Sequence, residues 1–147
     1  MDLKEGTSET ITIFKTAKVY LENQGNILIV EAIRSYILIE EFQKIFDKVN
    51  ELITQYQVTK LVFDKRKLKV FHQPSMEWYF ISWKDEAYNI GLRTIRKILP
   101  DDQVFRQSVK IGVSKIKTEN PEAKFNLMDI QYSETLEDAL KELGEWN

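Results

Sequence analysis

The chain has 147 residues, no cysteine, one histidine and a formal net charge of −2. This length fits a single domain that buries roughly two-thirds of the surface its unfolded chain exposes. The lack of cysteine excludes disulfides, thiolate zinc sites and thiol nucleophiles, and the single histidine excludes a multi-histidine metal site. The near-neutral charge gives no overall attraction to nucleic acid, so nucleic-acid binding is not expected.

The ends and apolar runs of the sequence predict a cytoplasmic protein. Residues Met1–Glu5 lack the basic-then-apolar pattern of an export signal. The longest apolar run, Ile27–Val30, is far shorter than the roughly 18 residues that a membrane span needs. We therefore expect no membrane span and a cytoplasmic location.

The first quarter of the chain predicts an arm and a hairpin. Residues 1–15 are polar and mixed and are expected to form a flexible N-terminal arm, which can add an edge strand. Residues 16–147 are expected to form a single domain. Apolar and polar residues alternate over 18–22, and the apolar run 27–30 follows a turn-like segment, so the pair predicts an antiparallel hairpin with a more buried second strand.

The middle of the chain predicts helix, strand, loop and helix. Apolar residues recur at helical spacing over 39–56. The short apolar run at 60–64 is bounded by charge and predicts a central strand covered on both faces. A basic loop over 65–73 follows, and a helix runs from Pro74 to Gly91 with one apolar stripe formed by Met76, Tyr79, Phe80, Trp83, Ala87 and Ile90.

The last third alternates strands and helices again. A strand over 94–99 is stopped by proline, and Asp101 and Asp102 then suit the start of a helix. Gly112 lies inside that helix, where glycine costs about 1 kcal/mol relative to alanine, so a close approach of backbone to a neighbouring element is expected. An edge strand at 128–132 and a final helix capped by Thr135 complete the chain.

This order predicts an α/β fold with a mostly parallel mixed sheet and an antiparallel hairpin at its start. The order, together with five local phrases, resembles the STAS-like superfamily over roughly residues 16–146. More closely it is similar to the small stand-alone bacterial domains grouped with anti-sigma-factor antagonists and, by fold, with CRAL-TRIO lipid-binding domains. The phrases are Leu61–Asp64, Arg66–Leu68, Glu77–Trp78, Ile98–Pro100 and Leu136–Leu140.

The resemblance implies four to five strands, helices packed mainly on one face, and a non-catalytic regulatory module that binds a protein partner or itself. In the antagonists a serine or threonine in the turn after the third strand is phosphorylated. The corresponding turn here, 64–67, has no hydroxyl or glycine beside its aspartate. Ser75, at the start of the next helix, is therefore carried over as the phosphorylation candidate.

The segment 65–78 holds the candidate partner-binding residues, which combine positive charge with one tryptophan predicted to point away from the core stripe. They are Lys65, Arg66, Lys67, Lys69, His72 and Trp78. Two plainer readings stay open: the charges can form an ordinary solvated loop, and Val70 or Phe71 can fold over the tryptophan.

Two further functions were weighed. The CRAL-TRIO resemblance and the many aromatic residues favour a small apolar-ligand or lipid-binding protein with a pocket between sheet and helices, as the alternative to a protein-binding module. An acid–base site of His72 with Asp64 is the third reading, and a structural histidine near a helix start is favoured over it. Five scattered glycines build no phosphate loop, so neither nucleotide hydrolysis nor a cofactor is expected.

Overall fold

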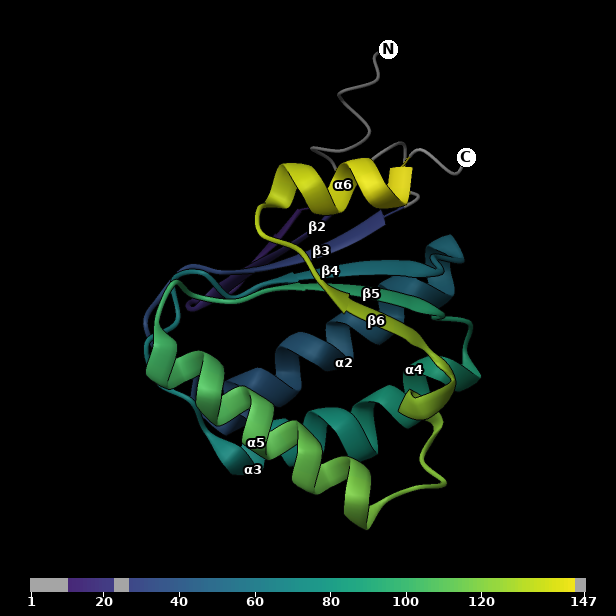
Figure 1. Cartoon of the computed structure of the whole chain (residues 1–147). Helices are drawn as coiled ribbons and strands as arrows, with labels where there is room; N and C mark the ends of the chain where they lie inside the picture. The colour runs from purple at the N-terminus through teal and green to yellow at the C-terminus, as the bar shows by residue number, and fades with distance from the viewer. Residues whose placement is uncertain (1–10, 23–26, 145–147) are drawn as a thin grey trace.

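The computed structural model describes residues 11–22 and 27–144, which form an α/β fold around one mixed sheet (Figure 1). In this part of the chain six strands lie side by side in sequence order. They are β1 (Thr12–Ile13), β2 (Ala17–Glu22), β3 (Ile27–Ala32), β4 (Lys60–Asp64), β5 (Thr94–Ile98) and β6 (Asp129–Tyr132). The predicted number of four to five strands is wrong by one, because the two-residue β1 extends the hairpin edge of the sheet.

The pairing confirms the predicted mixed sheet. Strands β1, β2 and β3 are antiparallel, and β3, β4, β5 and β6 are parallel. The predicted central strand is β4, which lies between β3 and β5. The register aligns Val30, Phe63, Lys97 and Tyr132 in one row across the four parallel strands. Because aligned residues share a face, this row places one lysine among apolar and aromatic side chains.

Helices cover both faces of the sheet unequally, as predicted (Figure 1). One face carries α2 (Ile39–Tyr56), α3 (Gln73–Glu77), the π-helical η1 (Trp78–Trp83), α4 (Lys84–Asn89) and α5 (Gln103–Glu119). The other face carries α6 (Leu136–Gly144), and a 3-10 turn, η2 (Lys124–Leu127), leads into β6. The larger hydrophobic core therefore lies between the sheet and these five helical segments, while a smaller one lies under α6.

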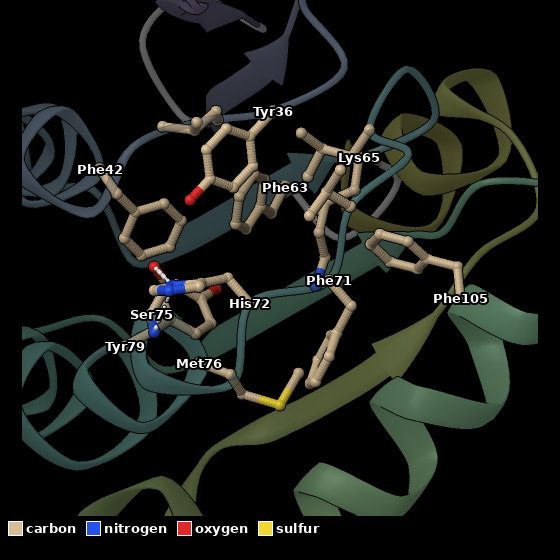
Figure 2. A pocket seen from close by; sticks show the side chains of 13 residues that line it. Tyr36, Phe42, Phe63, Lys65, Phe71, His72, Ser75, Met76, Tyr79 and Phe105 are labelled. Atoms are coloured by element: carbon tan, nitrogen blue, oxygen red, sulfur yellow. Dashed lines mark hydrogen bonds between the residues drawn. The ribbon is translucent and has the colours of Figure 1, made fainter.

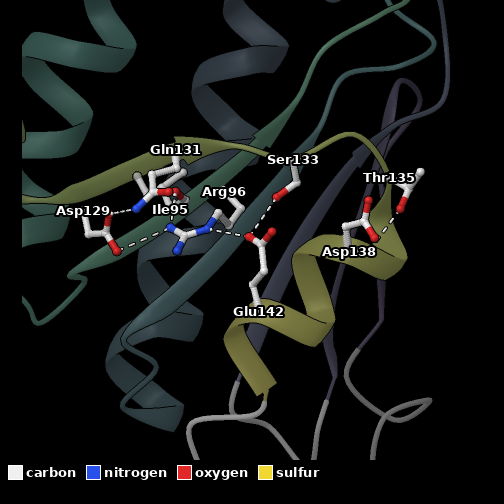
Figure 3. Close-up of polar contacts among 8 residues, drawn as sticks. All are labelled: Ile95, Arg96, Asp129, Gln131, Ser133, Thr135, Asp138 and Glu142. Carbon is white, nitrogen blue, oxygen red and sulfur yellow. Dashed lines mark hydrogen bonds and ion pairs between the residues drawn. The ribbon is translucent and has the colours of Figure 1, made fainter.

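Polar contacts fix α6 on the sheet (Figure 3). Arg96 of β5 points to the α6 side, where its Nε donates to Glu142 at 3.0 Å and its Nη1 lies 3.5 Å from Asp129. The Thr135 hydroxyl accepts from the backbone N–H of Asp138 at 3.0 Å, which confirms the predicted cap. Strand alternation thus sends Arg96 to one face of β5 and its neighbour Lys97 to the other.

The helix predicted from Pro74 to Gly91 contains a π turn that changes which residues are buried. The backbone N–H of Lys84 bonds to the Tyr79 carbonyl, five residues back. Such a turn holds about one residue more than an α turn, so positions after it rotate relative to a regular helix. As a result Lys84 is 0% exposed, and Ile90, predicted on the buried stripe, is 37% exposed.

Gly112 makes the close approach that its position predicts. A Cβ atom there would lie 2.7 Å from Gln73 Oε1, 3.1 Å from Met76 Sδ and 3.1 Å from Phe71 Cζ. The glycine therefore lets α5 pack directly against α3 and the loop before it.

Gly112→Val is expected to lower the free energy of unfolding by about 1–3 kcal/mol, because the branched side chain overfills this contact. Urea denaturation of the purified chain measures the change. Ser114→Val, on the exposed side of α5, is the matched control and is expected to stay within about 1 kcal/mol of the wild type. Equal effects of the two substitutions would contradict the close packing.

Candidate functional site

The loop after β4 is held in place by its backbone. The N–H of Lys65 donates to the Ile98 carbonyl at 2.8 Å, and the N–H of Lys69 donates to the Ser35 carbonyl at 2.8 Å. Leu68 between them is buried. The loop therefore lies, in an ordered form, outside the carboxyl ends of the parallel strands, which is where open α/β sheets commonly bind ligands.

The structure separates the predicted basic cluster into three kinds of residue. Arg66 makes two bonds to the carboxylate of Asp64, at 2.9 and 2.7 Å, and this bonding raises the pKa of Arg66. Lys65 is only 7% exposed, and burial lowers its pKa to about 8. Lys67 and Lys69 are exposed, and neither forms an ion pair with any residue in 11–22 or 27–144. Only these last two present uncompensated charge to solvent.

His72 and Ser75 form the start of α3. His72 is the N-cap residue, and its Nδ1 accepts from the Ser75 backbone N–H at 3.3 Å and lies 2.8 Å from Ser75 Oγ. Ser75 is 7% exposed, so a kinase would have to open this turn to reach the hydroxyl. Asp64 bonds to Arg66 and to no histidine among the described residues. The hypothetical pair of His72 with Asp64 is therefore not assembled.

Trp78 is half-buried, with its ring edge-on to Phe42 of α2 at 6.0 Å between centroids. The sequence predicts that Trp78 points away from the core. This prediction is wrong for the indole ring, which packs against α2. Phe42 of α2 therefore supplies part of the cover of this ring.

A pocket of about 60 Å³ opens between this loop, α2 and the start of α3 (Figure 2). Its inner wall is aromatic and its outer wall includes half-buried or exposed loop residues. It brings together three of the predicted site residues, Lys65, His72 and Ser75, and ten others: Tyr36, Ile37, Phe42, Phe63, Leu68, Val70, Phe71, Met76, Tyr79 and Phe105. The sequence assigned most of the aromatic ones to the core, since a helical stripe does not show where packing leaves a gap.

Two buried amines, one from the helical layer and one from the sheet, lie between these layers, and sequence analysis did not find them. Lys84 is 0% exposed and Lys97 is 1% exposed. The Nζ of Lys84 lies 3.3 Å from the centre of the Phe80 ring, and no described residue forms a hydrogen bond with it. Burial, followed by neighbouring positive charges, lowers the pKa of both lysines well below 10.5. The burial of Lys84 results from the π turn and that of Lys97 from the strand register, and neither feature can be seen in the sequence.

Comparisons of the chain with protein-family models, with curated proteins and with solved structures gave no match. The STAS-like resemblance therefore rests on the order of elements and the sequence phrases. Within residues 11–22 and 27–144, no three histidine or acidic side chains gather closely enough to hold a metal ion. No helix in the same ranges has the length and apolar character needed to cross a bilayer.

Proposed function

We propose that this protein is a non-catalytic binding module that recognises an acidic segment of a protein partner through the loop and pocket at the carboxyl ends of β3 and β4. The observation that carries the proposal is the aromatic pocket beside Lys67 and Lys69, two exposed lysines that form no ion pair with any residue that the structure describes. These lysines flank Leu68, which lines the pocket. A preformed apolar recess with a charged rim is the usual arrangement of a binding hot spot.

The size of the pocket favours a single side chain as its occupant. A water molecule needs about 10–15 Å³ measured in this way, so about 60 Å³ admits roughly four heavy atoms. A leucine, isoleucine or valine side chain has that size. Pockets for larger organic ligands begin near 300 Å³, so the alternative function, a lipid or apolar-ligand carrier, has less support from this pocket.

The charge of the rim favours an acidic partner. Lys67 and Lys69 add two exposed positive charges, and Lys65 adds a largely protonated amine at the pocket wall near neutral pH, because burial lowers its pKa only to about 8. Rim charges mainly accelerate association and select the partner, while the apolar anchor slows dissociation. As part of the proposal, the partner can also be a second copy of the chain, and the location is the cytoplasm, which the lack of cysteine favours.

Selection from a random peptide library on the full chain tests the proposal. The expected peptides carry one branched apolar residue next to two or more acidic residues. A synthetic peptide of this kind is expected to lose at least about tenfold in affinity, measured by fluorescence polarisation, against Lys67→Glu with Lys69→Glu. Replacing its apolar residue by alanine is expected to weaken binding to a similar extent, because the pocket is then left empty.

The control is Lys115→Glu with Lys141→Glu, which changes the net charge equally at exposed positions on α5 and α6. It is expected to bind the peptide with an affinity within about twofold of the wild type. Light scattering on the unmodified chain separates self-association from binding of another protein. Enrichment of no common motif, or equal binding by both charge-reversed variants, would defeat the proposal.

A further inference from the structure

A second cavity, of about 150 Å³, lies between α5, η2 and the strands β5 and β6. Its lining includes two lysines, Lys97 and Lys117, together with Tyr132, Asn126 and aromatic and aliphatic side chains. No aspartate or glutamate is part of that lining. The cavity shares no lining residue with the pocket of the proposed peptide site, so it is a separate feature of the molecule.

Lys97 points into this cavity from the sheet. It is aligned with Phe63 and Tyr132, on the face of the sheet that α2, α3, η1, α4 and α5 cover. Its Nζ lies 5.0 Å from the ring centres of both Phe80 and Tyr132. Ring faces attract an ammonium ion, but this attraction is smaller than the loss of hydration that an ion suffers on burial.

Lys84 lies next to Phe80, a residue of the cavity wall. Its Nζ lies over the Phe80 ring, and Phe80 also lines the cavity. Its position inside the helical layer results from the π turn, a feature that often marks functional sites. Two buried amines thus flank one aromatic ring, and among the described residues neither has a carboxylate to balance it.

We infer that this cavity, which we call the Lys97 cavity, binds a small tetrahedral oxyanion of the phosphate class, either inorganic phosphate or a compact phosphate ester. A bound dianion would supply the negative charge that the lysines lack, and lysine is a common phosphate ligand. At about 10–15 Å³ per water-sized atom, 150 Å³ admits roughly ten heavy atoms, which is enough for a phosphate group and a short substituent.

Anion binding is also expected to take up protons, because it favours the charged form of a buried amine. The titratable groups that face Lys97 are Lys117 from α5, Lys84 from α4, Lys65 from the loop and Tyr132 from β6. The positive neighbours lower the pKa of Lys97, after burial itself, and a bound anion opposes both effects by favouring the charged amine. Sulfate, which remains a dianion throughout, is therefore expected to bind more tightly as the pH falls below the ordinary lysine pKa of 10.5.

Titration calorimetry of the full chain with inorganic phosphate and with sulfate, at constant ionic strength, tests the inference. We expect saturable binding of both ions, with proton uptake seen as a dependence of the heat on the buffer. Lys97→Met is expected to weaken binding at least about tenfold, because it keeps the length of the side chain and removes its charge. Phosphoserine and glycerol phosphate then distinguish free phosphate from an ester.

Lys117→Gln is the second variant, because it removes a charge at the exposed end of the cavity without altering the core. We expect it to weaken binding about threefold or more. Lys115→Gln, exposed on the same helix and outside the cavity lining, is the control and should bind like the wild type. Absence of saturable binding by the wild type, or equal affinity of Lys97→Met, Lys117→Gln and Lys115→Gln, would overturn the assignment.

Discussion

Lys84→Met is expected to stabilise the protein, raising the free energy of unfolding by about 1–3 kcal/mol at neutral pH. The wild-type amine is fully buried and has no hydrogen-bond partner among the described residues. Methionine has a similar length and no charge, so it keeps the packing against Phe80 and Tyr79 and removes an unsatisfied polar group. Urea denaturation followed by circular dichroism measures the change.

The stabilisation is expected to depend on pH with a definite sign. The pKa of Lys84 in the folded state lies well below the ordinary 10.5. Between these two values the unfolded chain binds more protons than the folded chain, so the wild type gains stability as the pH rises. The advantage of Lys84→Met over the wild type is therefore larger at neutral pH and narrows as the pH rises toward 10.5.

Lys115→Met is the matched control, since Lys115 is exposed. It is expected to change the free energy of unfolding by less than about 0.5 kcal/mol. A loss of stability in Lys84→Met, or a gap in stability that widens toward pH 10, would contradict the assignment of Lys84 as an unsatisfied buried amine.

The same substitution connects stability with the inferred anion site. If the Lys97 cavity binds phosphate, Lys84→Met should gain stability and lose phosphate affinity together, because the unbalanced charge serves the bound ion. Proteins commonly retain residues that serve a function although they lower the stability of the fold. A gain in stability with unchanged phosphate affinity would instead assign Lys84 to the core alone.

The regular elements could be predicted from the sequence because each shows a repeating pattern. The helix Ile39–Tyr56 has the predicted bounds, the strand Lys60–Asp64 is central, and Asp102 caps its helix by accepting from the Phe105 N–H at 3.1 Å. Each of these depends on neighbours a few residues away, which is the range over which periodicity and capping act.

The candidate sites could not be predicted in the same way, because they depend on contacts between distant segments. The exposure of Lys67 and the burial of Lys65 follow from how the loop lies over Ile98 and Ser35. The burial of Lys84 follows from one π turn, and the 3.6-residue period used for prediction has no place for it. A polar residue beside an apolar stripe is therefore hard to place from sequence when the helix is irregular.

Trp83→Ala is expected to cause the largest loss of stability of any substitution considered, about 3–5 kcal/mol. Trp83 is 1% exposed, its ring stacks on Tyr79 at 5.0 Å between centroids, and its Nε1 donates to the Phe46 carbonyl at 3.1 Å. It therefore joins the π-helical segment η1 to α2. Removing the ring leaves a cavity at the point where the two helices meet the sheet.

Trp83→Phe separates the ring from the hydrogen bond. It keeps most of the buried aromatic surface and loses the donor to Phe46, so a loss of only about 1–2 kcal/mol is expected. Ser82→Ala, an exposed neighbour, should stay within about 0.5 kcal/mol of the wild type. If Trp83→Ala and Trp83→Phe lose equal stability by urea denaturation, the hydrogen bond dominates. If both lose less than about 1 kcal/mol, η1 is not held to α2 through this side chain.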